Sequence, residues 1–336
     1  MYGIMKKHRI RYRVEYWLVC LALVVVRLVP VRAAWALARC VGSAIYALLS
    51  KRRRIAVQNL LATGVAATPA EARRIAKASM QNFALLALES ILCPRFITPE
   101  RYGQFVEDQS HPEAKKFLLE SKEGCIVVSG HIGNWEVLAR VASFFKPMTA
   151  IARRMNNPLV QNLIQNGGSS RKDEHGDLEF VDKNSSDRFA LLRALRNGRQ
   201  LAILFDQYNR QHGIPVPFMG IPAWTVVSPA RLVMATHCTV IFGGCFRTKP
   251  GHFVYRADAP IRYELTGDRE ADAARIMADL NRRLERYVRE FPEQYLWSHR
   301  RWRNDIDPSA IHPAATAVFA AESSPQSSSQ TKETTP

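Results

Sequence analysis

The segment from 129 to 136, SGHIGNWE, carries the residue types best suited to catalysis in this chain. His131 and Glu136 supply an imidazole and a carboxylate, but residues five apart on an unbroken helix point about 140° apart and do not meet. A turn between them would change this geometry. Gly130 and Gly133 bracket His131 closely, which allows a tight turn and the close approach of a substrate. We therefore expect His131 to lie in a turn.

Asn134 is suited to cap the helix that follows this turn, which places Glu136 in the first helical turn. The helix dipole favours a carboxylate there, and from that position it can reach back to His131. An imidazole held by a carboxylate is a general base of fixed tautomer. Such a base can take the proton from a hydroxyl as its oxygen attacks an acyl carbon. The spacing alone leaves open the alternative of a structural histidine that caps a loop.

Other catalytic motifs are missing from the sequence. There is no GxSxG nucleophile elbow, so direct transfer to a hydroxyl is simpler than a route through an acyl-enzyme. The HExxH motif of zinc proteases and the lysine motif of phosphate-binding loops are also missing.

The elements that would position these groups alternate between strands and helices from about residue 124. Short apolar runs predict strands at 125–129, 148–152, 178–182, 201–205, 239–246 and 253–258. Helical stretches are predicted at 134–146, 158–166, 187–197, 228–236 and 268–290. This alternation predicts an α/β fold with a largely parallel central sheet flanked by helices. Functional groups gather at the carboxyl ends of such strands, so His131, Arg153 and Asp206 are expected to meet along one edge.

The formal net charge of +17 asks for an anionic partner. Basic residues between 6 and 13 come just before an apolar stretch, and Lys51–Arg54 come just after one. Basic clusters that bracket apolar sequence indicate an anionic membrane surface. Nucleic acid is not the expected partner, because no recognisable nucleic-acid-binding motif accompanies the charge.

The first 50 residues are predicted to form an apolar membrane anchor behind a basic amino terminus. The run from Tyr16 to Val29 is broken by Arg27, so its uncharged part is shorter than the roughly 20 residues of a spanning helix. We expect an interfacial or partly inserted helix, with a tilted single span or buried helices of a soluble domain as alternatives. A catalytic domain is expected over 51–307. The Ala-, Ser-, Thr- and Pro-rich end, 308–336, is expected to be a disordered tail.

Four blocks of sequence together carry a resemblance to a known family. GHIGNWE at 130–136 resembles the His-x4-acid motif of the lysophospholipid acyltransferase superfamily, in the form found in lipid A biosynthesis lauroyl/myristoyl transferases. The other blocks are RRMNNP at 153–158, DQ at 206–207 with PFMG at 217–220 and AWT at 223–225, and PEQYLWSHRRW at 292–302. In this combination and order they are specific, and they cover the chain from about 10 to 305.

The resemblance implies a glycerolipid acyltransferase-like fold with His131 as general base and Glu136 as its partner. It also implies that four further residues bind or polarise substrate, namely Arg153, Asn157, Asp206 and Gln207. Two positions depart from the usual pattern: Arg154 stands where the family often has proline, and Tyr208 where a second acid or asparagine is common.

The donor implied by the resemblance is an acyl thioester on acyl carrier protein, and the acceptor is a hydroxyl of a lipid A precursor. The reaction would be a late acylation in lipopolysaccharide biosynthesis at the cytoplasmic face of the bacterial inner membrane. A basic surface suits both anionic head groups and an acidic carrier protein. No metal or organic cofactor is expected, since the thioester is already activated.

Other acceptors and one other class of protein are the alternatives. The acceptor could be another glycolipid or an aminolipid, such as a phosphatidylinositol mannoside-like lipid or an ornithine lipid. The glycerol-phosphate branch is disfavoured, because its Pro-Glu-Gly-Thr-Arg block is missing from this sequence. A non-catalytic membrane-binding module would leave His131 and Glu136 dispensable.

Overall fold

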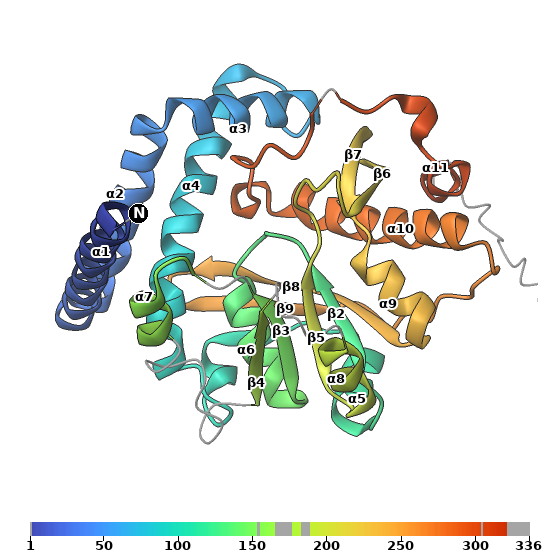
Figure 1. Cartoon of the computed structure of the whole chain (residues 1–336), viewed down its shortest axis with the longest axis horizontal. Coiled ribbons are helices and arrows are strands. Elements are labelled where there is room, and N and C mark those ends of the chain that lie inside the picture. Colours follow the sequence, from blue (N-terminus) through green and yellow to red (C-terminus); the bar gives the residue numbers. More distant parts are fainter. Residues whose placement is uncertain (1, 153–154, 165–176, 183–188, 304, 321–336) are drawn as a thin grey trace, which may run out of the picture.

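A seven-stranded sheet with the order β1-β9-β8-β2-β5-β3-β4 forms the centre of the described chain (Figure 1). The computed structural model describes residues 2–152, 155–164, 177–182, 189–303 and 305–320. The strands are β1 (Val106–Asp108), β2 (Cys125–Ser129), β3 (Met148–Ala152), β4 (Leu178–Asp182), β5 (Gln200–Leu204), β8 (Thr239–Lys249) and β9 (His252–Ala257). All neighbouring pairs are parallel except β8 and β9, which are antiparallel. The predicted α/β fold with a largely parallel sheet is thus confirmed.

Helices surround this sheet, and a separate antiparallel hairpin consists of β6 (Gly213–Phe218) and β7 (Ile221–Val226). The α-helices are α1 (Tyr2–Leu28), α2 (Val31–Leu48), α3 (Ser50–Ala62), α4 (Pro69–Leu92), α5 (Pro112–Glu120), α6 (Trp135–Phe145), α7 (Pro158–Ile164), α8 (Ala190–Arg196), α9 (Ser228–Thr236), α10 (Arg269–Glu290) and α11 (Pro313–Ala320). Short 3₁₀ turns are η1 (Cys93–Arg95), η2 (Tyr102–Gln104), η4 (Pro292–Gln294) and η5 (Pro308–Ala310).

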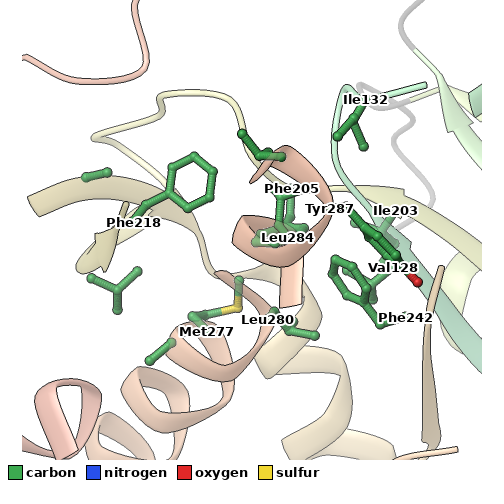
Figure 2. Close-up of a cluster of buried hydrophobic side chains, with 14 of the residues drawn as sticks. Val128, Ile132, Ile203, Phe205, Phe218, Phe242, Met277, Leu280, Leu284 and Tyr287 are labelled. Atoms are coloured by element: carbon green, nitrogen blue, oxygen red, sulfur yellow. The ribbon is translucent and has the colours of Figure 1, made fainter. Parts of the chain in front are cut away.

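Both faces of the sheet are buried, which explains why its central strands are continuously apolar. Along β2, Ile126 and Val128 belong to one core cluster and Cys125 and Val127 to the other, as the alternation of side chains in a strand requires. The first cluster lies between the sheet and α10. Figure 2 shows it: Val128, Ile203 and Phe242 from three strands meet Met277, Leu280, Leu284 and Tyr287 from the helix. The second cluster includes residues of α5 and α6.

The starts of the long helices follow capping rules that are visible in the sequence. The Thr68 hydroxyl accepts the amide of Glu71 at 3.2 Å, and Pro69 occupies the first helical position of α4. At the start of α10, Asp268 accepts the amides of Glu270 and Ala271 at 3.0 and 3.1 Å. These caps satisfy backbone donors that have no acceptor inside the helix.

The helix α2 has two apolar faces with different surroundings. One face carries Ala34, Trp35, Ala38 and Gly42, which are buried; α2 packs on α4 so closely that a Cβ on Gly42 would lie 2.4 Å from Gln81 Cα. The other face exposes five large side chains: Val31, Leu37, Val41, Ile45 and Leu48. On α1 a similar row is exposed at helical spacing: Ile10, Val14, Trp17, Leu18, Leu21 and Leu28. Rows of exposed apolar side chains of this size mark surfaces that contact a partner or a membrane.

The membrane anchor expected in the first 50 residues remains a prediction. Within the described residues, no helix taken singly has the length and apolar character needed to cross a membrane. The two helices α2 and α3 meet the criterion only when taken together, and they are bent by 91° relative to each other.

The expectation of a disordered tail from residue 308 onward is wrong for its first part. Residues 308–320 contain η5 and α11, and α11 packs against α10. Ala315 is fully buried there, and Val318 and Phe319 lie against the same core. Small and apolar side chains in this alanine-rich stretch fit against α10, which composition alone did not reveal. Residues 321–336 lie outside the described chain.

Candidate active site

His131 lies in the turn between β2 and α6, as predicted, and that turn is held from two sides. On one side, the amide of Asn134 donates to the carbonyl of Cys245 in β8 at 2.7 Å. On the other, the amide of Gly133 donates to Gln294 O at 3.0 Å, and the carbonyl of His131 accepts the amide of Leu296 at 3.1 Å. The turn is therefore fixed by β8 and by the carboxyl-terminal PEQYLWSHRRW segment.

Gly133 is required by the path of this turn. Its φ is +63°, a conformation that side chains with a Cβ rarely adopt. A Cβ added there would lie 2.1 Å from the carbonyl oxygen of Cys245. No larger residue fits without moving β8 away from the turn, so the glycine allows both the turn and its close contact with the sheet.

The register of two neighbouring strands brings His131 and Asp206 together. Ser129 at the end of β2 is paired with Leu204 at the end of β5, so the residues two positions beyond each strand lie at the same height. His131 Nδ1 is 2.6 Å from Asp206 Oδ1. The backbone amide of His131 also lies 3.0 Å from each of the two carboxylate oxygens. The side chain of Asp206 is 2% exposed and that of His131 is 17% exposed.

Asp206 remains ionised although it is buried. Burial by itself would raise the pKa of its carboxyl. The pKa is nevertheless lowered by the charge of His131, by hydrogen bonds from the ring and the backbone amide of His131, and by the charge of Arg301. An ionised Asp206 can only accept hydrogen bonds, so in the neutral form of the imidazole the hydrogen is on Nδ1. The lone pair of that imidazole is then on Nε2, where Gln207 Nε2 lies at 3.1 Å. This is the tautomer that a general base needs.

Glu136 does not occupy the place that the sequence predicted for it. Asn134 caps α6 as expected, accepting the amide of Val137 at 3.1 Å, and Glu136 is in the first helical turn. However, the carboxylate on Nδ1 is that of Asp206, and within the described chain no hydrogen bond joins Glu136 to His131. Glu136 is open to solvent, yet the protein around it raises the pKa of its carboxyl by desolvation; Trp135 and Arg140 act in the opposite direction.

The remaining predicted site residues are distributed differently. Gln207 joins His131, as described above. Asn157 is buried and bonds to other partners: its Oδ1 accepts the amide of Leu159 at 3.0 Å, and its Nδ2 donates to the carbonyl of Tyr12 at 2.9 Å. Asn157 therefore caps α7 and ties it to α1. Arg153 lies outside the described residues. No group of three or more potential metal ligands occurs in the described part of the chain.

Comparison with known proteins identifies the family of this chain. The model of the bacterial lipid A biosynthesis acyltransferases matches residues 4–304. The chain belongs to this family. It is 23% identical over 293 residues to the lipid A biosynthesis palmitoleoyltransferase of Escherichia coli, which covers 86% of this chain and 92% of that protein. It is 26% identical over 207 residues to a lipid A biosynthesis acyltransferase of Haemophilus influenzae, covering 60% of this chain but only 63% of that protein.

Two buried residues that were not singled out from the sequence lie close enough to Asp206 to interact with its charge. Arg301 is 1% exposed; its Nη2 donates to Thr225 Oγ1 at 2.7 Å and its Nη1 donates to the carbonyl of Trp224. Tyr295 is also buried, and burial followed by the negative charge of Asp206 raises the pKa of its phenol well above the usual range. The signal that could have found them is the density of arginine and aromatic residues in the 292–302 block. A buried carboxylate needs such partners to remain charged.

His299 supports the segment after Asp206 by a hydrogen bond. Its Nε2 accepts the backbone amide of Tyr208 at 3.0 Å, which only a neutral imidazole can do. Desolvation is the largest cause that lowers the pKa of His299 to about 4, with Arg301 and other nearby cations acting in the same direction.

This pKa predicts that acid destabilises the folded protein through His299. The unfolded chain binds a proton on this residue near pH 6.5, whereas the folded chain binds it only near 4. Between these values the unfolded state holds more protons, so the free energy of unfolding falls as the pH is lowered through that window. We expect the midpoint of thermal unfolding to fall more steeply from about pH 7 to about pH 5 in the wild type than in His299→Gln, which cannot titrate. Parallel curves for the two proteins would contradict this assignment.

Proposed function

We propose that this protein transfers a fatty acyl chain from an acyl carrier protein thioester to a hydroxyl of a lipid A precursor, as a late acylation in lipopolysaccharide biosynthesis. Family membership supports acyl transfer in lipid A synthesis. The observation that carries the mechanism is the contact of 2.6 Å between His131 Nδ1 and the buried Asp206 carboxylate. This contact supports a base whose free nitrogen, Nε2, is turned toward the acceptor.

The proposed reaction needs only this chain, a thioester and a hydroxyl. His131 Nε2 takes the proton of the acceptor hydroxyl while the oxygen attacks the thioester carbonyl. The tetrahedral intermediate collapses, the carbon–sulfur bond breaks, and the thiolate takes the proton back from the imidazolium. An ester has then formed, a free thiol has left, and His131 is neutral again. Asp206 stabilises the imidazolium while it exists. Gln207, which lies on Nε2, would give way to the hydroxyl.

Two groups are proposed to stabilise the negative charge on the carbonyl oxygen. Inside α6 the amides of Trp135 and Glu136 have no acceptor, because they belong to the first helical turn. Donors fixed in this way favour an oxyanion strongly in a site that excludes water. Arg153, which belongs to the RRMNNP block that carries the family resemblance, is the second candidate. Asn157, four residues after Arg153, would act indirectly, since it holds the start of α7 against α1.

Glu136 keeps a proposed catalytic role beside that of Asp206. It lies five residues after His131 in the same turn and helix start, where the helix dipole favours its negative charge. A carboxylate that is solvent-accessible but surrounded by protein can accept a hydrogen bond from an incoming hydroxyl group of the acceptor. It also adds negative charge beside the imidazolium. We therefore propose that Glu136 acts on the substrate side of the imidazole and Asp206 on the protein side.

The proposed place of action is the cytoplasmic face of the bacterial inner membrane. The exposed apolar rows of α1 and α2 support contact with lipid. The basic run at Lys51–Arg54 directly after α2 supports contact with anionic head groups. The net charge of +17 also supports recognition of an acidic carrier protein that brings the acyl chain.

The donor and acceptor can be tested together. Membranes that contain the protein would be incubated with a tetra-acylated lipid A precursor and the same acyl chain on either acyl carrier protein or coenzyme A. We expect mass spectrometry to show one added acyl ester, formed at least about tenfold faster from the carrier protein, because charge attraction speeds this encounter. The preference should shrink as salt is added.

Membranes without the protein are the control for this experiment. Equal rates from the two donors would contradict the carrier protein as partner and leave acyl transfer standing. An ester formed only on an ornithine lipid or a mannoside lipid, and never on the lipid A precursor, would overturn the proposed acceptor.

A further inference from the structure

A buried carboxylate that the proposed chemistry does not use contacts the catalytic turn, which is the segment from His131 to Glu136. Glu89 in α4 is fully buried and accepts hydrogen bonds from three different elements. Arg247 in β8 forms an ion pair with it, with Nε at 2.6 Å from Oε1. Asn134 Nδ2 donates to Oε2 at 2.8 Å, and Trp35 Nε1 in α2 donates to Oε1 at 3.2 Å. One carboxylate therefore joins α2, α4, α6 and β8.

The contact with Asn134 leads directly into the catalytic turn. Asn134 donates to Glu89 with its Nδ2, while its Oδ1 accepts the amide of Val137 and so caps α6. An amide side chain can face either way, and the negative charge of Glu89 fixes the orientation in which the oxygen points to the helix. The start of α6, with Glu136 in its first turn, thus depends on the position of Glu89.

Arg247 is linked to the same turn by a second set of hydrogen bonds. The side chain of Gln294 pairs with the backbone of Arg247, accepting its amide at 2.9 Å and donating to its carbonyl at 3.0 Å. The carbonyl of Gln294 in turn accepts the amide of Gly133. The Glu89–Arg247 pair is therefore linked to the turn by hydrogen bonds through both Asn134 and Gln294.

Trp35 connects the Glu89–Arg247 pair to α2, the helix whose opposite face is exposed and apolar. Its ring is buried between α2 and α4, next to Leu88 and Leu92 in the same cluster. A carboxylate already paired with arginine does not need the indole N–H to be satisfied. The added hydrogen bond fixes the height and rotation of α2 relative to Glu89. A second hydrogen bond between these helices, from Gln81 Nε2 to Ser43 Oγ at 2.8 Å, has no such connection to the turn.

We propose that Glu89 is a positioning residue through which Trp35 and α2 hold the catalytic turn from His131 to Glu136 in its working geometry. The kinetic part of this inference rests on the proposed acyl transfer. Its structural part does not, because the order of the turn can be measured without substrate. A charge buried for packing alone would be replaceable together with its partner at little cost. A positioning residue would not be replaceable, because the turn loses its support even when the protein stays folded.

The first test compares two substitutions that each remove one hydrogen bond between α2 and α4. Trp35→Phe removes the indole donor and keeps the ring in the core, and Ser43→Ala is the matched control. We expect Trp35→Phe to raise amide hydrogen exchange in a peptide covering 130–138 by about tenfold and to lower kcat by about tenfold with KM unchanged. Ser43→Ala should change each quantity by less than about twofold. Equal effects of the two substitutions would overturn the proposal.

The second test removes the buried pair without leaving an unpaired charge. The double variant Glu89→Gln with Arg247→Met is expected to fold, since neither charge remains. We expect it to show the same rise in exchange at 130–138 with wild-type exchange in α10, and exchange at wild-type level across 130–138 would overturn the proposal. If the wild type itself transfers no acyl chain, the proposed function fails, while the exchange measurements still decide the role of Glu89.

Discussion

Replacing His131 with alanine is expected to lower acyl transfer by about 10²–10⁴-fold, because the site then has no group to take up the hydroxyl proton. Glu136→Ala is expected to lower it by about 100-fold, because the imidazolium and the acceptor lose a carboxylate at the helix start. Both substitutions should act mainly on kcat, since charge on the imidazole develops only during the reaction. The measurement is single-turnover formation of the new acyl ester, followed by mass spectrometry.

Two residues at the surface offer matched controls for these substitutions. His252 is a histidine on the surface at the start of β9, and Glu113 is an exposed carboxylate in the first turn of α5. His252→Ala and Glu113→Ala should leave transfer within about twofold of the wild type, as surface changes away from a site generally do. Transfer that survives the loss of both His131 and Glu136 would rule out the proposed base mechanism.

The strands were predictable because burial on both faces leaves a continuous apolar signature. The runs at 125–129, 148–152 and 178–182 have the same bounds as β2, β3 and β4. The hairpin of β6 and β7 was not predicted. Its prolines, Pro215, Pro217 and Pro222, oppose a strand assignment within a sheet, and they are tolerated because this hairpin is a separate pair of strands with two free edges.

The members of the site were largely predictable, but their partners were not. The sequence indicates that His131 and Asp206 lie at the ends of strands on one edge of the sheet. It does not indicate that β5 lies directly beside β2, because β3 and β4 come between them in the chain. The sequence therefore favours Glu136, five residues from His131, over Asp206, which is 75 residues away. Adjacency within a sheet is a tertiary property, and local spacing does not contain it.

The same limit applies to the support of the site. Nothing in the local sequence around Glu89 distinguishes a buried charge from one on a solvated helix face. Only the packed structure shows that Glu89 accepts a hydrogen bond from Asn134. Likewise, only the structure shows that the charge of Arg301 helps to lower the pKa of Asp206. Buried ionic groups of this kind are costly unless each finds its partners, which are far apart in the chain.

Replacing Asp206 with asparagine is expected to lower kcat by about 10³–10⁴-fold with little change in KM. Asparagine has nearly the same shape and can still accept the backbone amide of His131. Its Nδ2, however, is a donor, and placed against Nδ1 it would favour the tautomer with the hydrogen on Nε2. The imidazole would then have no lone pair to offer the hydroxyl. A buried negative charge that stabilises the imidazolium would also be lost.

Asp258→Asn is the matched control for this prediction. Asp258 is a partly buried aspartate that forms ion pairs with Arg283 and Arg286 on α10, so its replacement removes a structural carboxylate outside the site. It should affect stability and leave transfer per folded molecule within about twofold. A loss of less than about tenfold in Asp206→Asn, together with a larger loss in Glu136→Gln, would reverse the assignment. Glu136 would then be the carboxylate that holds His131 during the reaction, and the arrangement with Asp206 would describe the enzyme only before its substrates bind.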